Sequence, residues 1–181
     1  SIPNLNVFRP ADRMETIECW EHALKSSKTP SVLSLTRQNL EPIRKKYSNV
    51  NKCSLGAYEV FRTNKKIHLT IIASGSEVNL AIETSHKLAK EKVYSKVISM
   101  PCQDLFDSQS RTYKQKILNE TKMKISIEAA STDSWKKYVG NEGLTFGIDT
   151  FGKSAPYKEI YKYFGLTAAN IANKSKKLIN R

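Results

Sequence analysis

Short apolar runs alternate with longer segments of helical periodicity from residue 67 onward, and this alternation is the feature that most constrains the fold. The runs of strand length lie at 67–73, 96–100, 124–128 and 144–149. The segments with helical spacing lie at 77–91, 108–118, 132–138, 156–164 and 168–180. Such alternation is typical of α/β proteins, so we predict a three-layer domain with a mostly parallel (mixed) sheet.

The beginning of the chain carries a separate helix–strand unit. A helix is predicted over 12–26, because Asp12 and Glu15 form a capping-box-like start. Its apolar residues repeat at helical spacing as one stripe, which consists of Met14, Ile17, Trp20 and Leu24. A run at 31–36 has the composition of a buried parallel strand. Helix, short loop and strand together indicate the closing half of a βαβ unit.

A polar stretch at 41–56 separates this unit from the rest of the chain. It contains Pro42 and Gly56, which favours an interdomain connection. A strand is predicted at 57–62, and the turn-like TNKK separates it from the strand at 67–73. We therefore expect these two strands to form a hairpin at the entrance of the second domain.

Charge and composition limit the partners of the protein. Among its 181 residues, 30 Lys and Arg outnumber 17 Asp and Glu, for a net charge of +13. A basic chain suggests nucleic acid, but the lysines are spread evenly and no block of like charge or nucleic-acid motif is present. We therefore predict no nucleic-acid partner. A basic protein does attract anionic small molecules, sugar phosphates included.

The pattern of cysteines and the length of the apolar runs allow a prediction of the cellular compartment. No run approaches the ~20 consecutive apolar residues that a membrane span needs, and residues 1–16 lack the pattern of a secretory signal. Cys19, Cys53 and Cys102 form no CxxC pair and indicate neither a disulfide framework nor a zinc site. We predict a cytoplasmic protein with no membrane partner.

Most polar candidates for a site have a structural interpretation. ASGSEV, at 73–78, is a strand–glycine–helix junction whose backbone N–H groups could face an anion. A plain N-cap role for Ser76 is favoured over a ligand site there. The three histidines fall within predicted elements and are expected to be structural or surface residues: His22, His68 and His86.

Arg37 is the strongest candidate. It follows the run SVLSLT immediately, and open α/β sheets bind ligands at the carboxyl ends of their strands. The guanidinium group offers a fixed fork of donors that suits a phosphate or a carboxylate. Position and residue type alone weigh an anion site and a structural salt bridge equally.

Six strings together carry a resemblance to a known family. They are FRPADRMET, LTRQNL, IIASGSEVNLAI, VISMPCQDLFDSQ, KYVGNEGLTFGIDTFGKSAP and FGLTAANI. Their content, order and spacing resemble the C-terminal part of transketolase over essentially the whole chain. The combination is far more specific than any one string.

The resemblance implies a layout and an activity. Residues 1–40 would be the end of the pyrimidine-binding domain, 41–56 a linker, and 57–181 the transketolase C-terminal domain. Transketolases transfer a two-carbon ketol unit between sugar phosphates in the pentose phosphate pathway. They use thiamine diphosphate with Mg or Ca and work as homodimers.

Only one residue role transfers to this chain. Within LTRQNL the family's arginine binds the substrate phosphate, which corresponds to Arg37, although Thr36 stands where many members have Ser. The family's catalytic, cofactor and metal residues lie upstream of this sequence. The resemblance therefore implies a chain that binds no cofactor or metal alone, is inactive alone, and needs the N-terminal thiamine-binding portion of the enzyme, in the same or a separate chain.

Two alternatives stay open at this point. The chain could belong to another thiamine diphosphate enzyme of the same plan, such as deoxyxylulose-phosphate synthase or a 2-oxo acid dehydrogenase. It could also be a non-catalytic interaction or regulatory module that has kept the fold and lost the reaction. The LTRQNL and GIDTFGKSAP strings favour transketolase over the first, and the presence of Arg37 argues against the second.

Overall fold

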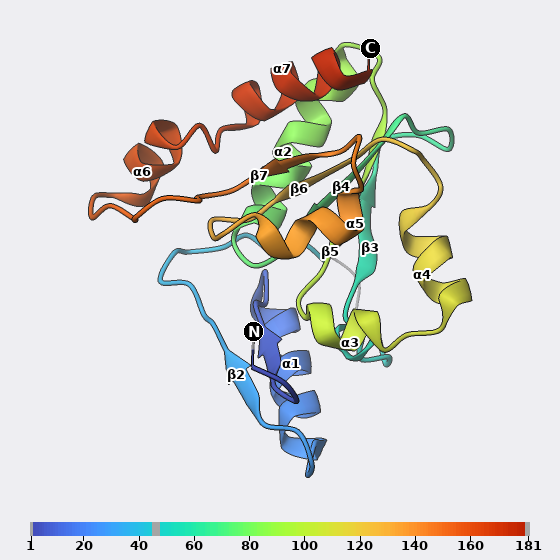
Figure 1. Ribbon diagram of the computed structural model, residues 1–181, viewed down its shortest axis with the longest axis vertical. Helices are drawn as coiled ribbons and strands as arrows, with labels where there is room; N and C mark the ends of the chain where they lie inside the picture. The colour runs from blue at the N-terminus through green and yellow to red at the C-terminus, as the bar shows by residue number, and fades with distance from the viewer. Residues whose placement is uncertain (1, 45–47, 180–181) are drawn as a thin grey trace.

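The computed structural model describes residues 2–44 and 48–179, which form a small N-terminal unit and a larger sheet domain (Figure 1). The small unit consists of β1 (Asn6–Phe8), α1 (Arg13–Lys25) and β2 (Ser31–Leu33). The two strands are parallel, with Val7 opposite Val32. The unit is therefore a βαβ motif, as its predicted closing half indicated, although β2 is shorter than the predicted run and only partly buried.

Helix α1 begins as the sequence predicts. The Asp12 side chain accepts a hydrogen bond of 2.8 Å from the Glu15 N–H group. The Glu15 carboxylate reaches back to the Ala11 N–H group at 2.7 Å, one residue before the cap. This reciprocal arrangement satisfies two donors that a helix start leaves free.

The larger domain is built on five strands. They are β3 (Tyr58–Arg62), β4 (Leu69–Ala73), β5 (Ser95–Ser99), β6 (Lys124–Ile127) and β7 (Leu144–Phe146), in the order β3-β5-β4-β6-β7. The β3 strand pairs antiparallel with β5, and the other pairings are parallel. The predicted β3–β4 hairpin is therefore wrong. Every residue of β4 is buried, which suits a central strand, whereas β3 is partly exposed and takes the edge.

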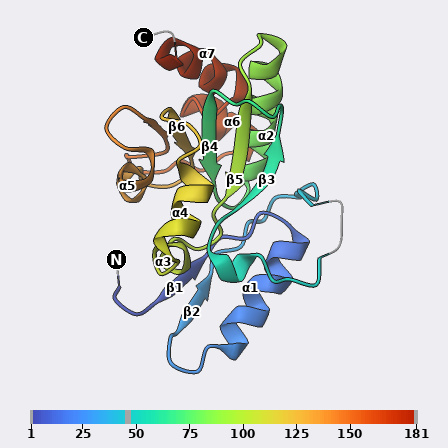
Figure 2. The ribbon, with the colours of Figure 1, turned by 90° about the vertical axis from the view of Figure 1, so that its right-hand side faces the viewer.

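Helices cover both faces of this sheet (Figures 1 and 2). One face packs against α2 (Glu77–Lys90) and α7 (Ala168–Ile179), in a core that includes Ile71, Val78 and Ile171. The other face packs against α3 (Gln103–Asp107), α4 (Arg111–Leu118) and α5 (Lys136–Val139), with Ile72 and Phe106 in its core. Because Ile71 and Ile72 are consecutive in β4, they point to opposite faces. The predicted three-layer α/β domain is confirmed.

Three short elements complete the domain. They are the 3-10 helices η1 (Cys53–Leu55) and η2 (Asp133–Trp135) and the helix α6 (Tyr157–Tyr163). Figure 1 shows α6 beyond the end of the sheet, at the left. In the part of the chain that the structure describes, no helix combines the length and the apolar character needed to cross a membrane.

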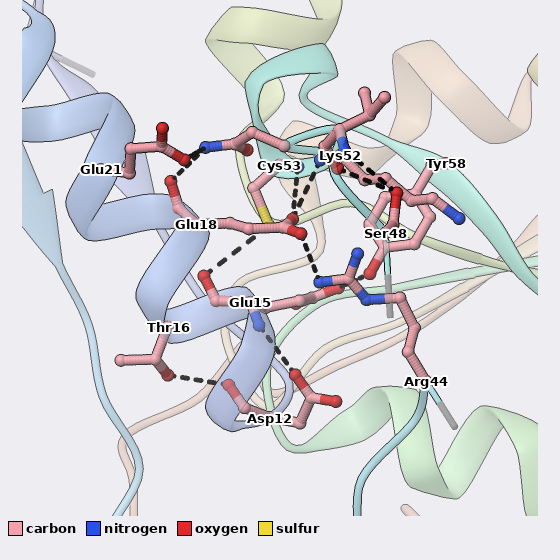
Figure 3. Close-up of polar contacts among 12 residues, drawn as sticks. Asp12, Glu15, Thr16, Glu18, Glu21, Arg44, Ser48, Lys52, Cys53 and Tyr58 are labelled. Atoms are coloured by element: carbon pink, nitrogen blue, oxygen red, sulfur yellow. Dashed lines mark hydrogen bonds and ion pairs between the residues drawn. The ribbon is translucent and has the colours of Figure 1, made fainter. Parts of the chain in front are cut away.

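Helix α1 turns a polar face toward the larger domain (Figure 3). Glu15 is fully buried and accepts hydrogen bonds from the hydroxyls of Tyr58 and Ser99, at 2.7 and 2.6 Å. Glu18 pairs with Arg44 at 2.7 Å and accepts the N–H group of Cys53 at 3.1 Å. These acids join α1 to β3, β5 and the connection between the two parts.

The predicted apolar stripe of α1 lies on its opposite face. Ile17, Trp20 and Leu24 are 56%, 49% and 80% exposed, respectively. The helix is therefore held in this chain by its buried glutamates and by the fully buried Cys19, while three of the four predicted stripe residues face outward.

Candidate functional site

The carboxyl ends of β4 and β6 face the N-terminal unit, and a charged cluster fills the space between them. Arg9 directly follows β1 and lies between two acids. Its Nη2 is 3.2 Å from Glu77 Oε2, and its Nη1 is 2.6 Å from Glu128 Oε1. Glu77 begins α2, and Glu128 directly follows β6. One arginine thus ties the N-terminal unit to two strand ends of the large sheet.

Further donors satisfy both carboxylates. Glu128 accepts hydrogen bonds from Ser74 Oγ and Trp135 Nε1, each at 2.7 Å. Glu77 accepts the N–H group of Ala129 at 3.0 Å and also a short hydrogen bond from the hydroxyl of Tyr161. Its Oε1 accepts a further bond of 2.6 Å from the Ser76 hydroxyl. Because buried carboxylates need such partners, this cluster is a fully connected junction between the two parts.

The ASGSEV turn serves the same junction. Gly75 has a φ of +57°, and its N–H group donates to the carbonyl oxygen of Arg9 at 2.9 Å. Ser76 is the N-cap residue of α2, as predicted, but its side chain makes no cap hydrogen bond to the helix. Its hydroxyl bonds the adjacent Glu77 instead. The N–H groups of Glu77 and Val78, at the start of α2, donate to the carbonyl oxygens of Ser74 and Gly75 at 3.3 and 3.2 Å.

A cavity of about 320 Å³ lies beside this cluster. The segment after β2 lines one side, with Ser34, Thr36 and Gln38, and α6 lines the other, with Tyr157 and Tyr161. Gln38 Nε2 reaches the Tyr161 hydroxyl at 3.4 Å. The cavity therefore lies between the string that contains Arg37 and the large domain.

Arg37 itself is exposed and stands four residues beyond Leu33, the last paired residue of β2. None of the ion pairs within the described part of the chain includes it. The salt bridge that was weighed against an anion site is therefore not formed by the described residues. Arg37 does not line the cavity, although its neighbours Thr36 and Gln38 do. Its exposed guanidinium group, which is always charged, keeps its donors available for an anion.

The other candidates from the sequence have structural surroundings. Each histidine packs against an aromatic ring: His22 on Phe8, His86 on Phe61 and His68 on Tyr94. The three cysteines are buried free thiols that meet beside Phe8, although they are distant in sequence: Cys19, Cys53 and Cys102. Burial raises the pKa of the Cys102 thiol to about 11, so it is not a nucleophile at neutral pH.

The charged cluster offers no free ligand set for the divalent cation that the family resemblance implies. A cation would need free oxygen ligands, but Glu77 and Glu128, the acids beside the cavity, are already occupied by Arg9 and neighbouring donors. Within residues 2–44 and 48–179, no three His, Cys, Asp or Glu side chains gather closely enough to hold a metal ion.

Sequence reasoning had not singled out Arg9, Glu77, Glu128 or Tyr161. Arg9 and Glu128 each follow a strand of the structure directly. The strand-end argument that selected Arg37 did not reach them, because no strand was predicted before Arg9 and the predicted run at 124–128 included Glu128. Tyr161 lies on a helix that follows an irregular segment, and no local pattern places it at this junction.

Comparisons with known proteins converge on one family. Residues 56–167 match the family model described as the transketolase-like TK C-terminal domain, and residues 1–42 match the transketolase pyrimidine-binding domain. A transketolase of Sinorhizobium medicae is 42% identical over 180 residues, which are 99% of this chain and 26% of that protein.

Solved structures agree with the sequence comparisons. A transketolase from Leishmania mexicana is 40% identical, with a TM-score of 0.89 over 99% of this chain and 26% of its own. A Pichia stipitis transketolase in complex with sedoheptulose 7-phosphate is 36% identical, with a TM-score of 0.88 over 98% of this chain and 25% of its own. The chain thus spans about a quarter of the length of the relatives it matches.

Proposed function

Because this chain belongs to the transketolase family, we propose that it forms the C-terminal part of an enzyme that transfers a two-carbon ketol unit between sugar phosphates. The observation that carries the proposal is the match of both the pyrimidine-binding segment and the C-terminal domain, in the family's order, along one chain. Residues 1–40 are assigned to the end of the pyrimidine-binding domain, 41–56 to a linker and 57–181 to the C-terminal domain.

Arg37 is the proposed ligand of the substrate phosphate. Its exposure and its lack of an acidic partner among the described residues support this role. The Pichia stipitis relative binds sedoheptulose 7-phosphate, a sugar phosphate of the expected class. A guanidinium group can bind two phosphate oxygens in its plane.

The partner of this chain is the preceding, thiamine-binding portion of the enzyme, as part of the same polypeptide or as a separate one. The exposed face of α1, with Ile17, Trp20 and Leu24, is the first surface it would cover. The second is the face of the small sheet that bears Val7 and Val32, which are 42% and 46% exposed. Parallel sheets are normally covered on both faces.

The small size of the β1–β2 sheet also supports the proposal that this chain holds only part of the pyrimidine-binding domain. It has two strands of three residues each, and an isolated sheet of that size has little stability of its own. In the described part of the chain, the outer edges of β1 and β2 have no paired strand. More strands of the pyrimidine-binding domain would extend the sheet there, since edges left open invite pairing.

Thiamine diphosphate and Mg or Ca would be bound by that partner portion. The chain alone would then be inactive, and the complete enzyme would be a homodimer. We assign the enzyme to the cytoplasm, because its three buried cysteines are free thiols, as expected in a reducing compartment.

A complementation assay tests this proposal. The chain is mixed with a thiamine-binding N-terminal portion of a transketolase, and ketol transfer from xylulose 5-phosphate to ribose 5-phosphate is measured with and without thiamine diphosphate. Transfer that requires both portions and the cofactor supports the proposal. Absence of transfer, together with salt-sensitive binding of DNA or RNA, would reject it. Tight binding of thiamine diphosphate to the chain alone, measured by calorimetry, would contradict the proposal that the N-terminal portion binds the cofactor.

A further inference from the structure

Two side chains of the larger domain reach the segment that follows Arg37. The Tyr161 hydroxyl on α6 lies 3.4 Å from Gln38 Nε2. Asn79 Nδ2 on α2 donates to the carbonyl oxygen of Glu41 at 3.2 Å. The large domain therefore contacts the side chain of Gln38 and the backbone of Glu41, both in the segment that leaves Arg37.

Tyr161 is itself held firmly. Its hydroxyl donates to Glu77, which is fully buried and fixed by Arg9 and by the Ala129 N–H group. The Tyr157 ring packs edge-on against the Tyr161 ring, with centroids 5.8 Å apart. Burial, with the nearby Glu77 charge, raises the pKa of Tyr161 to about 12, so the hydroxyl keeps its proton at neutral pH.

The segment around Arg37 has few other anchors. The N–H group of Ser34 donates to the Phe8 carbonyl oxygen at 2.8 Å, before Arg37. The N–H group of Gln38 donates to Thr36 Oγ1 at 3.1 Å, which closes a tight local turn. Arg37 lies between these points and is exposed. Recognition of a phosphate by one arginine depends on the backbone that carries it, because misplacement by about 1 Å can weaken a site substantially.

We propose that Tyr161 is a positioning residue for substrate binding: it holds Gln38 through its hydroxyl and so fixes the backbone on which Arg37 meets the sugar phosphate. This inference rests on the proposed function of Arg37. It also gives the C-terminal domain a part in substrate binding, through the path from Glu77 to Tyr161 to Gln38, in addition to packing.

The first test needs no activity. Hydrogen exchange of the Gln38 backbone amide, which donates to Thr36 Oγ1, is compared for the chain and for Tyr161→Phe, with Tyr163→Phe as the matched control on the same helix. Tyr163 is 66% exposed. Loss of one neutral hydrogen bond should speed exchange about 2- to 12-fold in Tyr161→Phe, and the control should be unchanged. Equal exchange in all three proteins would overturn the proposal.

The second test separates positioning from stability. In the complete enzyme, Tyr161→Phe should raise KM for a phosphorylated ketose about 2- to 12-fold, leaving kcat and the KM for the unphosphorylated sugar unchanged. Gln38→Ala breaks the same contact without touching Glu77, so it should have the same effect, and the double variant should add nothing more.

Each outcome of the second test is decisive. A fall in kcat at constant KM, or an equal rise of KM for both sugars, would overturn the proposal. If the complete wild-type enzyme shows no ketol transfer, the proposed function fails, and the exchange measurement still decides whether Tyr161 fixes this segment.

Discussion

Replacing Glu15 by Gln should change how the stability of the protein depends on pH. Burial raises the pKa of Glu15 to about 6 from an ordinary value of 4.5. Hydrogen bonds from Ser99, Tyr58 and the Ala11 N–H group oppose that rise, and the Asp12 charge adds to it. Desolvation is the largest influence, because the carboxyl group is fully enclosed between α1 and the large domain.

The direction in which stability changes with pH follows from proton linkage. The folded protein binds the Glu15 proton more tightly than the unfolded chain does, so its stabilising contribution is fully present below pH 4.5 and is lost as the pH rises to about 6. The difference between these two values, at about 1.4 kcal/mol per pH unit, corresponds to about 2 kcal/mol. Glu15→Gln removes this proton, so the stability of the wild type relative to the variant should fall by about that amount between pH 4.5 and 7.

The assay is urea unfolding of both proteins at steps of half a pH unit. Glu21→Gln is the matched control on the same helix, because hydrogen bonds from Lys25 and Asn51 lower the pKa of Glu21. Its stabilising contribution is lost only as the pH falls below 4.5, so its difference from wild type should be constant from pH 4.5 to 7. A constant difference for Glu15→Gln over the same range would refute the buried, proton-binding Glu15 described above.

Two further substitutions test packing and assembly. Gly56→Ala should lower the free energy of unfolding by about 2 kcal/mol or more in a urea titration, because Gly56 has a φ of +77° and a Cβ there would lie 2.1 Å from the Phe106 backbone nitrogen; near-wild-type stability would contradict this packing. Trp20→Ser should change the stability of the chain by only about 1 kcal/mol or less, yet weaken its binding to the N-terminal portion about tenfold or more in calorimetry. Val50→Ser, at a residue 63% exposed outside the α1 face, is the control for assembly, and equal affinities of both variants would rule out the α1 face as the docking surface.

The elements of the large domain were largely predictable because their runs are long and buried. Strand β4 is apolar except for Thr70 and is buried along its whole length, and the apolar residues of α2 repeat at helical spacing. Strand β1 has three residues, which is too short for a periodic signal. The partner of β3 was mispredicted because adjacency in sequence favoured a hairpin, whereas the buried centre of the sheet is filled by β4 and β5.

The orientation of α1 could not be predicted from the sequence pattern of the helix itself. Its stripe of apolar residues is real, but the helix is held in this chain by Glu15 and Glu18, whose partners in the rest of the chain lie 26 to 84 positions away. Apolar periodicity identifies a face that needs cover, and it does not say whether that cover is present in the same chain.

The role of Arg37 stays a prediction. It rests on the place of Arg37 after the predicted run at 31–36, because α/β sheets present ligand-binding groups at the carboxyl ends of their strands. The junction of Arg9 with Glu77 was missed, since those residues are 68 positions apart and each has an ordinary role in its own segment. Only the folded chain brings the two strand ends together.

The most direct measurement for the central claim is the KM of the complete enzyme for a phosphorylated substrate with Arg37→Ala. Removal of one charged phosphate contact costs about 1.5–3 kcal/mol, so KM should rise about 10- to 150-fold. The kcat and the KM for the unphosphorylated sugar should stay near wild type, and Arg37→Lys should restore only part of the loss. An unchanged KM for the phosphorylated substrate would contradict the assignment of Arg37 as its phosphate ligand.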